Sequence, residues 1–216
     1  MAKQRTSGLI QTETSPLIKT FSGEGKNVIL AMTGTSGSIY GLRMLRALLI
    51  NDFNVDLILS EYAEYTFFKE CGVDLKKTNI TALFPEILIQ KSTITFHNNL
   101  DLKSEIFTNK YVCSGMIVVP CSMGILAGIA NGEAKTLMEK SADYAMSYSR
   151  PLIIVPRETP LNKIHLKNML KIMDGGGMIV PAMPSFEYSP SNFNDLADHV
   201  AGKVMDLLFN NSNSLV

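Results

Sequence analysis

An apolar run that leads directly into a glycine-rich turn and a helix is the feature that most constrains this chain. Residues 28–32 (VILAM) are typical of a buried strand, and residues 33–38 (TGTSGS) predict a tight turn. Ile39, Leu42 and Leu45 then recur at helical spacing. A strand, a tight turn and a helix in this order form the opening unit of a doubly wound α/β fold.

The same unit recurs along the chain, which predicts a mostly parallel sheet. Further buried strands are expected at residues 55–59, 115–119, 152–155 and 178–180. Helices are expected at residues 63–70 (with Gly72 as the stop), 125–130, 134–146, 161–173 and 194–209. Residues 73–112 are less regular and suggest only short elements at 83–85 and 93–96. The predicted fold class is a three-layer, doubly wound α/β domain, Rossmann-like or flavodoxin-like.

Length and composition favour one compact domain. The chain has 216 residues, of which 46% are hydrophobic. We expect a flexible polar arm over residues 1–26, the domain over 27–209 and a flexible tail over 210–216. No apolar run reaches the ~20 residues of a membrane span, and the N-terminus lacks the apolar segment of a signal peptide. A cytoplasmic location is therefore expected.

Charge and cysteine usage exclude several classes of function. The 20 basic and 20 acidic residues balance, and no basic block indicates nucleic-acid binding. Three cysteines without a C-x-x-C pair argue against a disulfide framework or a zinc site. The histidines, His97, His165 and His199, share no ligand spacing, so no metal is expected.

Polar turns follow five predicted strands, and the carboxyl ends of parallel strands meet at one edge of a sheet. These turns are residues 34–38, Ser60, residues 121–124, residues 157–158 and residues 181–188. Ligands of doubly wound folds bind beyond this edge. The sequence therefore predicts a single ligand site there.

Individual residues of these turns leave alternatives open. Residues 34–37 (GTSG) suit a phosphate at a helix N-terminus, although a structural turn is equally compatible with their spacing. The turn at Ser122 repeats the pattern and favours a ligand the size of a nucleotide. Arg157 offers a forked donor for an anion, or else forms a surface pair with Glu158. Spacing alone places Glu70 on a solvated helix face.

Four segments resemble the UbiX family of flavin prenyltransferases. They are residues 32–43 (MTGTSGSIYGLR), 120–124 (PCSMG), 155–160 (VPRETP) and 164–170 (IHLKNML), and the similarity extends over about residues 28–208. The wider flavoprotein family includes Cys decarboxylases of coenzyme A synthesis. Those enzymes carry an Asn-containing P-x-M-N-type segment where this chain has residues 181–185 (PAMPS), which favours the prenyltransferase branch.

The resemblance implies an activity and a set of partners. Members of the family form homo-oligomers, usually dodecamers, that bind FMN between subunits without a metal. They transfer a dimethylallyl group from dimethylallyl phosphate to N5 and C6 of reduced FMN. The prenylated flavin then serves a decarboxylase of the UbiD type.

The resemblance also implies a set of site residues. The positions that match the family's flavin contacts are Gly34, Thr35, Ser36, Ser60, Ser122, Met123, Gly124, Ile125 and Arg157. Glu70 and Glu158 match active-site carboxylates: Glu158 would handle the proton as phosphate leaves, and Glu70 would position the reacting flavin. Arg157 completes this catalytic group, and Lys203 matches a basic phosphate contact.

Two positions depart from the family where the leaving phosphate binds. A family lysine is Ser147 here, and a family tyrosine is Glu187, with Tyr188 one place later. A carboxylate facing a phosphate at ~4 Å costs about 1 kcal/mol in water and more in a closed site. Either Glu187 points away and Tyr188 replaces the hydroxyl, or the chain is an FMN-binding homologue that stores or delivers flavin. An FMN-dependent decarboxylase is a third alternative.

Overall fold

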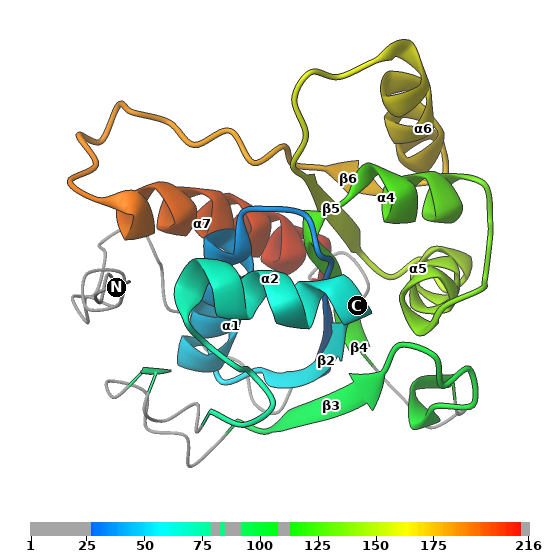
Figure 1. The fold of residues 1–216 in the computed structure, drawn as a ribbon. Coiled ribbons are helices and arrows are strands. Elements are labelled where there is room, and N and C mark those ends of the chain that lie inside the picture. Colours follow the sequence, from blue (N-terminus) through cyan, green and yellow to red (C-terminus); the bar gives the residue numbers. More distant parts are fainter. Residues whose placement is uncertain (1–26, 79–82, 85–91, 108–112, 213–216) are drawn as a thin grey trace.

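The computed structural model describes residues 27–78, 83–84, 92–107 and 113–212. In these residues one parallel sheet has the strand order β3-β2-β1-β4-β5-β6 (Figure 1). The strands are β1 (Asn27–Met32), β2 (Asn54–Leu59), β3 (Ile94–Asn98), β4 (Cys113–Cys121), β5 (Leu152–Pro156) and β6 (Met178–Ile179). This is the Rossmann strand order and not the flavodoxin order, and it confirms the predicted doubly wound class.

Helices cover both faces of the sheet because the strand residues alternate between the faces. Val28, Leu30 and Met32 of β1 pack in one core with α1 (Ser38–Ile50), α2 (Glu61–Cys71) and α7 (Phe193–Ser212). Ile29 and Ala31 pack in the other core with α4 (Met123–Ala130), α5 (Leu137–Ser147) and α6 (Lys163–Asp174). The two helix layers are visible on either side of the sheet in Figure 1. Apolar side chains on both faces of a strand are expected in a parallel sheet.

Capping residues decide where two helices begin. The predicted start of α5 at residue 134 is three residues early, because the Thr136 hydroxyl accepts from the amide of Glu139 and the Glu139 carboxylate accepts from the amide of Thr136. The predicted start of α6 at residue 161 is two residues early, because the Asn162 side chain caps that helix. Gly72 ends α2 with a φ of 68°, as predicted.

Residues 73–112, whose sequence pattern is irregular, contain one edge strand of the sheet. The element expected at residues 93–96 is the edge strand β3, and a short 3-10 helix, η1 (Glu105–Phe107), follows it. The element expected at 83–85 lies mostly outside the described residues. So do the expected arm at residues 1–26 and residues 213–216 of the expected tail. Helix α7 continues to Ser212, beyond its predicted end at residue 209. No helix in the described ranges is long and apolar enough to cross a membrane.

Candidate functional site at the carboxyl edge of the sheet

Hydrogen bonds between neighbouring strand ends join the predicted turns. The Thr33 hydroxyl donates to the carbonyl of Pro120 (2.7 Å) and accepts from the amide of Ser122 (2.9 Å). The amide of Ser60 donates to the carbonyl of Met32 (3.0 Å). The strand order reverses between β1 and β4, and the ligand crevice of a Rossmann fold lies at this point of the carboxyl edge. The expected convergence of polar turns on one edge is thereby confirmed.

Glu70 occupies the N-terminus of α1. Its Oε2 atom accepts from the amides of Gly37 (2.9 Å) and Ser38 (2.8 Å). Half-burial raises the pKa of Glu70, but hydrogen bonds from Ser36, Ser38 and Gly37 outweigh it and leave the pKa below its usual value. The expectation of a solvated Glu70 was wrong, and a protein carboxylate sits where the turn predicts an external phosphate. The role of Gly34, Thr35 and Ser36 as flavin contacts stays a prediction.

The first glycine of this turn is required by the close approach of α2. A Cβ atom on Gly34 would lie 2.3 Å from the Cβ of Tyr62 and 2.7 Å from its carbonyl carbon. The hydroxyl of Thr66 donates to the carbonyl of Gly34 (3.1 Å). Helix α2 therefore holds the turn from one side, with its N-terminal residues at the sheet edge.

Two helix N-termini remain open to an anion. Ser60 caps α2 by accepting from the amide of Ala63 (3.2 Å), and Ser122 caps α4 by accepting from the amide of Ile125 (3.5 Å). First-turn amides lack acceptors within their own helix, and Met123 is the first residue of α4. A Cβ on Gly124 would meet nothing within 4 Å, so the space beside α4 is free for a ligand. Ser60 and Ser122 to Ile125 thus fit the predicted binding of a flavin phosphate or ring oxygen.

Arg157 lies at the end of β5 with part of its guanidinium unsatisfied. Its backbone carbonyl accepts from the Thr35 hydroxyl (3.2 Å), and its amide donates to the carbonyl of Cys121 (3.2 Å). Its Nε atom is buried and has no hydrogen-bond partner among the described residues. Since a buried unsatisfied donor is costly, this N–H is expected to be satisfied by a ligand.

A pocket of about 340 Å³ opens beside Arg157. Glu158 and Thr159 contribute polar groups, and the apolar walls come from Pro156, Leu161, Met169, Pro181, Ala182 and Met183. The Glu158 carboxylate is exposed and accepts from the amide of Thr159 (2.8 Å), so the alternative of an Arg157–Glu158 surface pair is not what the structure has. The Arg157 cation at the end of an apolar pocket suits a small ligand with an anionic head.

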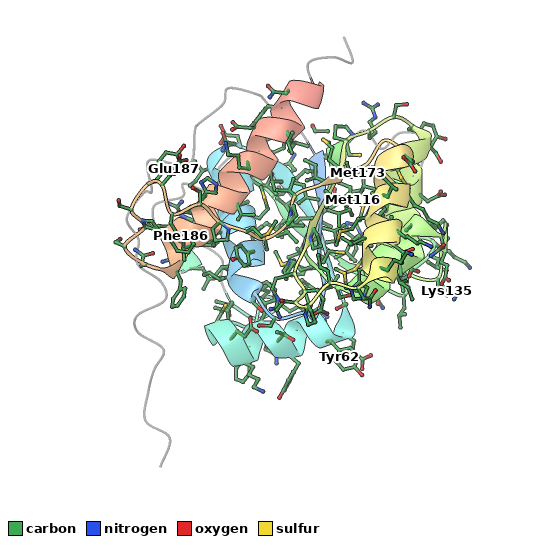
Figure 2. The ribbon with its side chains drawn as sticks, turned by 90° about the horizontal axis from the view of Figure 1, so that it is seen from above. Tyr62, Met116, Lys135, Met173, Phe186 and Glu187 are labelled. Atoms are coloured by element: carbon green, nitrogen blue, oxygen red, sulfur yellow. The ribbon has the colours of Figure 1, made fainter. Side chains whose placement is uncertain are left out.

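The other residues predicted to bind the substrate are not among those that line this pocket; they are Ser147, Glu187, Tyr188 and Lys203. Ser147 is exposed at the end of α5, shortly before β5 begins at the amino edge of the sheet. Glu187 is exposed, and Figure 2 shows its side chain at the periphery, on the side of the molecule opposite Lys135. The ring of Tyr188 lies 5.7 Å from that of His199 on α7. Lys203, which is exposed, follows His199 by one helical turn.

Tyr40 and Met169 are neighbours of the site that the pattern of turns does not identify, whereas Met183 belongs to the predicted turn at residues 181–188. Tyr40 lies in the first turn of α1, and its ring borders the same space beside Gly37 as the Arg157 side chain. Met169 and Met183 line the pocket. The position of Tyr40 just after a predicted strand-turn-helix junction is the signal that could have found it. No group of three or more His, Cys, Asp or Glu side chains that could hold a metal occurs in the described part of the chain.

Replacing Glu70 with glutamine is expected to lower stability in a pH-dependent way. A carboxylate whose folded pKa is depressed stabilises the fold above its unfolded pKa, and the contribution is lost as pH falls through the folded value. The Glu70→Gln variant should thus be less stable than the parent by about 1 kcal/mol at pH 7, and the difference should be smaller near pH 3. Urea unfolding at both pH values tests this, with the exposed Glu105→Gln as control. A difference that is unchanged at low pH would contradict it.

Comparison with known proteins assigns the family. The flavoprotein family profile matches residues 19–206. The chain is 38% identical over 185 residues to the flavin prenyltransferase UbiX of Alkalihalophilus pseudofirmus, covering 85% of this chain and 91% of that protein.

Two solved structures agree with this assignment. A UbiX protein in complex with FMN and dimethylallyl pyrophosphate superposes with a TM-score of 0.77 at 33% identity, covering 88% of this chain and 95% of that one. A dodecameric FMN-dependent UbiX-like decarboxylase from Escherichia coli O157:H7 gives a TM-score of 0.73 at 35% identity, covering 83% and 92%. The chain therefore belongs to the flavoprotein family and, within it, to the UbiX-type flavin prenyltransferases.

Proposed function

We propose that this protein transfers a dimethylallyl group from dimethylallyl phosphate to reduced FMN. The observation that carries the proposal is the pocket at the carboxyl edge, where Arg157 and Glu158 stand at the end of an apolar cavity. Family membership supplies the class of reaction. The solved UbiX relative binds dimethylallyl pyrophosphate, so the diphosphate is the alternative donor.

The residues of the crevice fit FMN. The capped N-termini of α2 and α4 provide donors for its phosphate or ring oxygens, and Arg157 provides a buried N–H without a partner in the described residues. Thr35 and Ser36 border the same crevice from the β1 turn. When bound in its reduced form, FMN supplies the nucleophilic atoms that receive the dimethylallyl group.

The protein itself positions the reactants and stabilises the charge that develops on the leaving phosphate. As the carbon–oxygen bond of the donor breaks, negative charge collects on the leaving phosphate, and the Arg157 guanidinium stabilises it. Glu158 is placed to hold or deliver a proton at the phosphate oxygen. The apolar walls hold the prenyl group in line and exclude water from it. Glu70 keeps the turn between β1 and α1 in the conformation that borders the site.

An oligomer accounts for the residues that lie outside the pocket. Ser147 sits near the opposite edge of the sheet, so it can reach a site of this kind only in another subunit. We propose a homododecamer in the cytoplasm, supported by the dodecameric relative, with the prenylated flavin passed to a UbiD-type decarboxylase. In such an assembly Tyr188 and Lys203 would contact the donor phosphate, with Tyr188 replacing the hydroxyl absent at Glu187.

Mass spectrometry of the flavin tests the proposed function. The protein is incubated anaerobically with reduced FMN and either dimethylallyl phosphate or the diphosphate. A flavin heavier by one C5 unit, absent without protein, is the expected product. FMN that copurifies with the protein and stays unmodified with both donors would instead favour the flavin-binding homologue. Ser147 and Glu187 are the observations behind that second candidate. Release of CO2 from an aryl acid would indicate the decarboxylase.

Restoring the two family side chains is expected to improve donor binding. In the variant Ser147→Lys with Glu187→Tyr, a cation is gained and an anion is removed at the phosphate site. At about 1 kcal/mol per charge contact in water, the two changes should lower the KM for dimethylallyl phosphate by roughly 10- to 30-fold. Steady-state kinetics at saturating FMN measures it, with each single variant as control. An unchanged KM would show that neither position faces the phosphate.

A further inference from the structure

The side chains of Tyr40 and Arg157 both border the space beside Gly37 where a Cβ atom would lie. A Cβ atom on Gly37 would lie 3.1 Å from Cδ2 of Tyr40 and 3.6 Å from Cδ of Arg157. The amide of Tyr40 donates to the carbonyl of Gly37 (3.0 Å), which places the tyrosine in the first turn of α1. Gly37 has a φ of 107°, a conformation that a residue with a side chain rarely adopts. Because Gly37 has no side chain, the aromatic ring and the arginine stem can both occupy the space beside it.

The main chain of Arg157 is anchored, whereas its side chain is held chiefly by packing. The hydroxyl of Thr35 and the carbonyl of Cys121 bond only its backbone. The buried Nε–H has no partner among the described residues. An arginine stem has several rotatable bonds, so a neighbouring ring that restricts it preorganises the guanidinium.

The charge of Arg157 is not neutralised by its aromatic neighbour. Burial raises the pKa of the Tyr40 hydroxyl, and the Arg157 charge opposes this only in part. Tyr40 therefore keeps its proton at neutral pH. It therefore adds no negative charge beside the Arg157 guanidinium.

We propose that Tyr40 is a positioning residue for Arg157, holding the guanidinium so that its buried Nε–H meets an oxygen of a bound oxyanion. The proposal rests on the proposed function for the identity of that oxyanion, which is an FMN oxygen or the phosphate of the prenyl donor. Two ligand measurements distinguish these sources. The Kd of FMN, from quenching of flavin fluorescence, reports the first, and the KM of dimethylallyl phosphate reports the second.

A double-mutant cycle tests the proposal. Arg157→Met and Tyr40→Ala are each expected to weaken the same ligand by about 10- to 100-fold, the range of a hydrogen bond to a charged group. The double variant should be no weaker than Arg157→Met alone, because Tyr40 acts through the arginine. Tyr40→Phe, which keeps the ring, should stay within about 3-fold of the parent by the same reasoning. Tyr65→Ala, at an exposed tyrosine of α2, is the matched control.

Other outcomes would overturn the assignment. Additive losses in the double variant would mean that Tyr40 acts independently of Arg157, and an unchanged affinity in Tyr40→Ala would mean that it does not act at all. If Tyr40→Ala fails to fold, Tyr40→Phe becomes the deciding variant. A loss of affinity in Tyr40→Phe as large as that in Arg157→Met would assign the role to the hydroxyl and contradict positioning by the ring. If the parent binds FMN without transferring a C5 unit, the proposed function fails, but the cycle on the Kd of FMN still decides this inference. A parent that binds neither ligand overturns both.

Discussion

Replacing Asp198 with alanine is expected to lower the free energy of unfolding by about 3–5 kcal/mol, the cost of leaving a buried charge without its partner. Asp198 on α7 accepts from Nε of Arg43 (2.6 Å) and from its terminal nitrogen (2.5 Å). The side chains are only 5% exposed for Arg43 and 0% for Asp198. Because this bidentate pair joins α1 to α7, its loss would leave the Arg43 guanidinium buried in the larger of the two cores.

Urea unfolding at fixed protein concentration measures this effect, since association also contributes to apparent stability. The double variant Arg43→Met with Asp198→Leu removes both charges and should recover most of the loss. As an exposed control, Asp74→Ala breaks the surface pair with Lys77 and should lower stability far less than Asp198→Ala. A change of similar size in Asp198→Ala and Asp74→Ala would refute the argument from burial.

Replacing Glu158 with glutamine is expected to lower the kcat of prenyl transfer by about 10²- to 10⁴-fold, the usual contribution of a general acid or base. The carboxylate lies at the pocket beside Arg157, and within the described part of the chain it accepts only the local hydrogen bond from the amide of Thr159. Glutamine has nearly the same shape and keeps an acceptor for that amide, but it cannot exchange a proton. The change should therefore affect catalysis and leave the fold intact.

Single-turnover rates and FMN binding together test the role of Glu158. The Kd of FMN should stay within about 2-fold of the parent, because a proton-transfer group acts on the transition state and not on ground-state binding. Glu105→Gln, at an exposed carboxylate of η1, should leave both quantities unchanged. If Glu158→Gln transfers the prenyl group at the rate of the parent, the proton is handled elsewhere.

Local patterns in the sequence determined the order of strands and helices. The apolar run of residues 28–32, the glycines of the first turn and the helical spacing that follows all act within a few residues of one another. Helix ends followed capping chemistry, and the two early starts at α5 and α6 arose because Thr136 and Asn162 are caps and not helical residues. The parallel arrangement, and with it one edge for all the polar turns, followed from this order.

Tertiary structure alone decided which side chains meet at that edge. Glu70 contacts Gly37 and Ser38, which lie more than 30 positions earlier, and Arg43 finds Asp198 at a separation of 155. Tyr40 and Arg157 border the same space beside Gly37 only because β1 and β4 are neighbours and β5 follows them in the sheet. Contacts of this kind leave no periodic signal, because each depends on how distant elements pack and not on the residues beside it. The sequence thus determined the elements and the edge at which the polar turns converge, whereas only packing decided that a protein carboxylate fills the first helix N-terminus and that the Nε–H of Arg157 has no partner among the described residues.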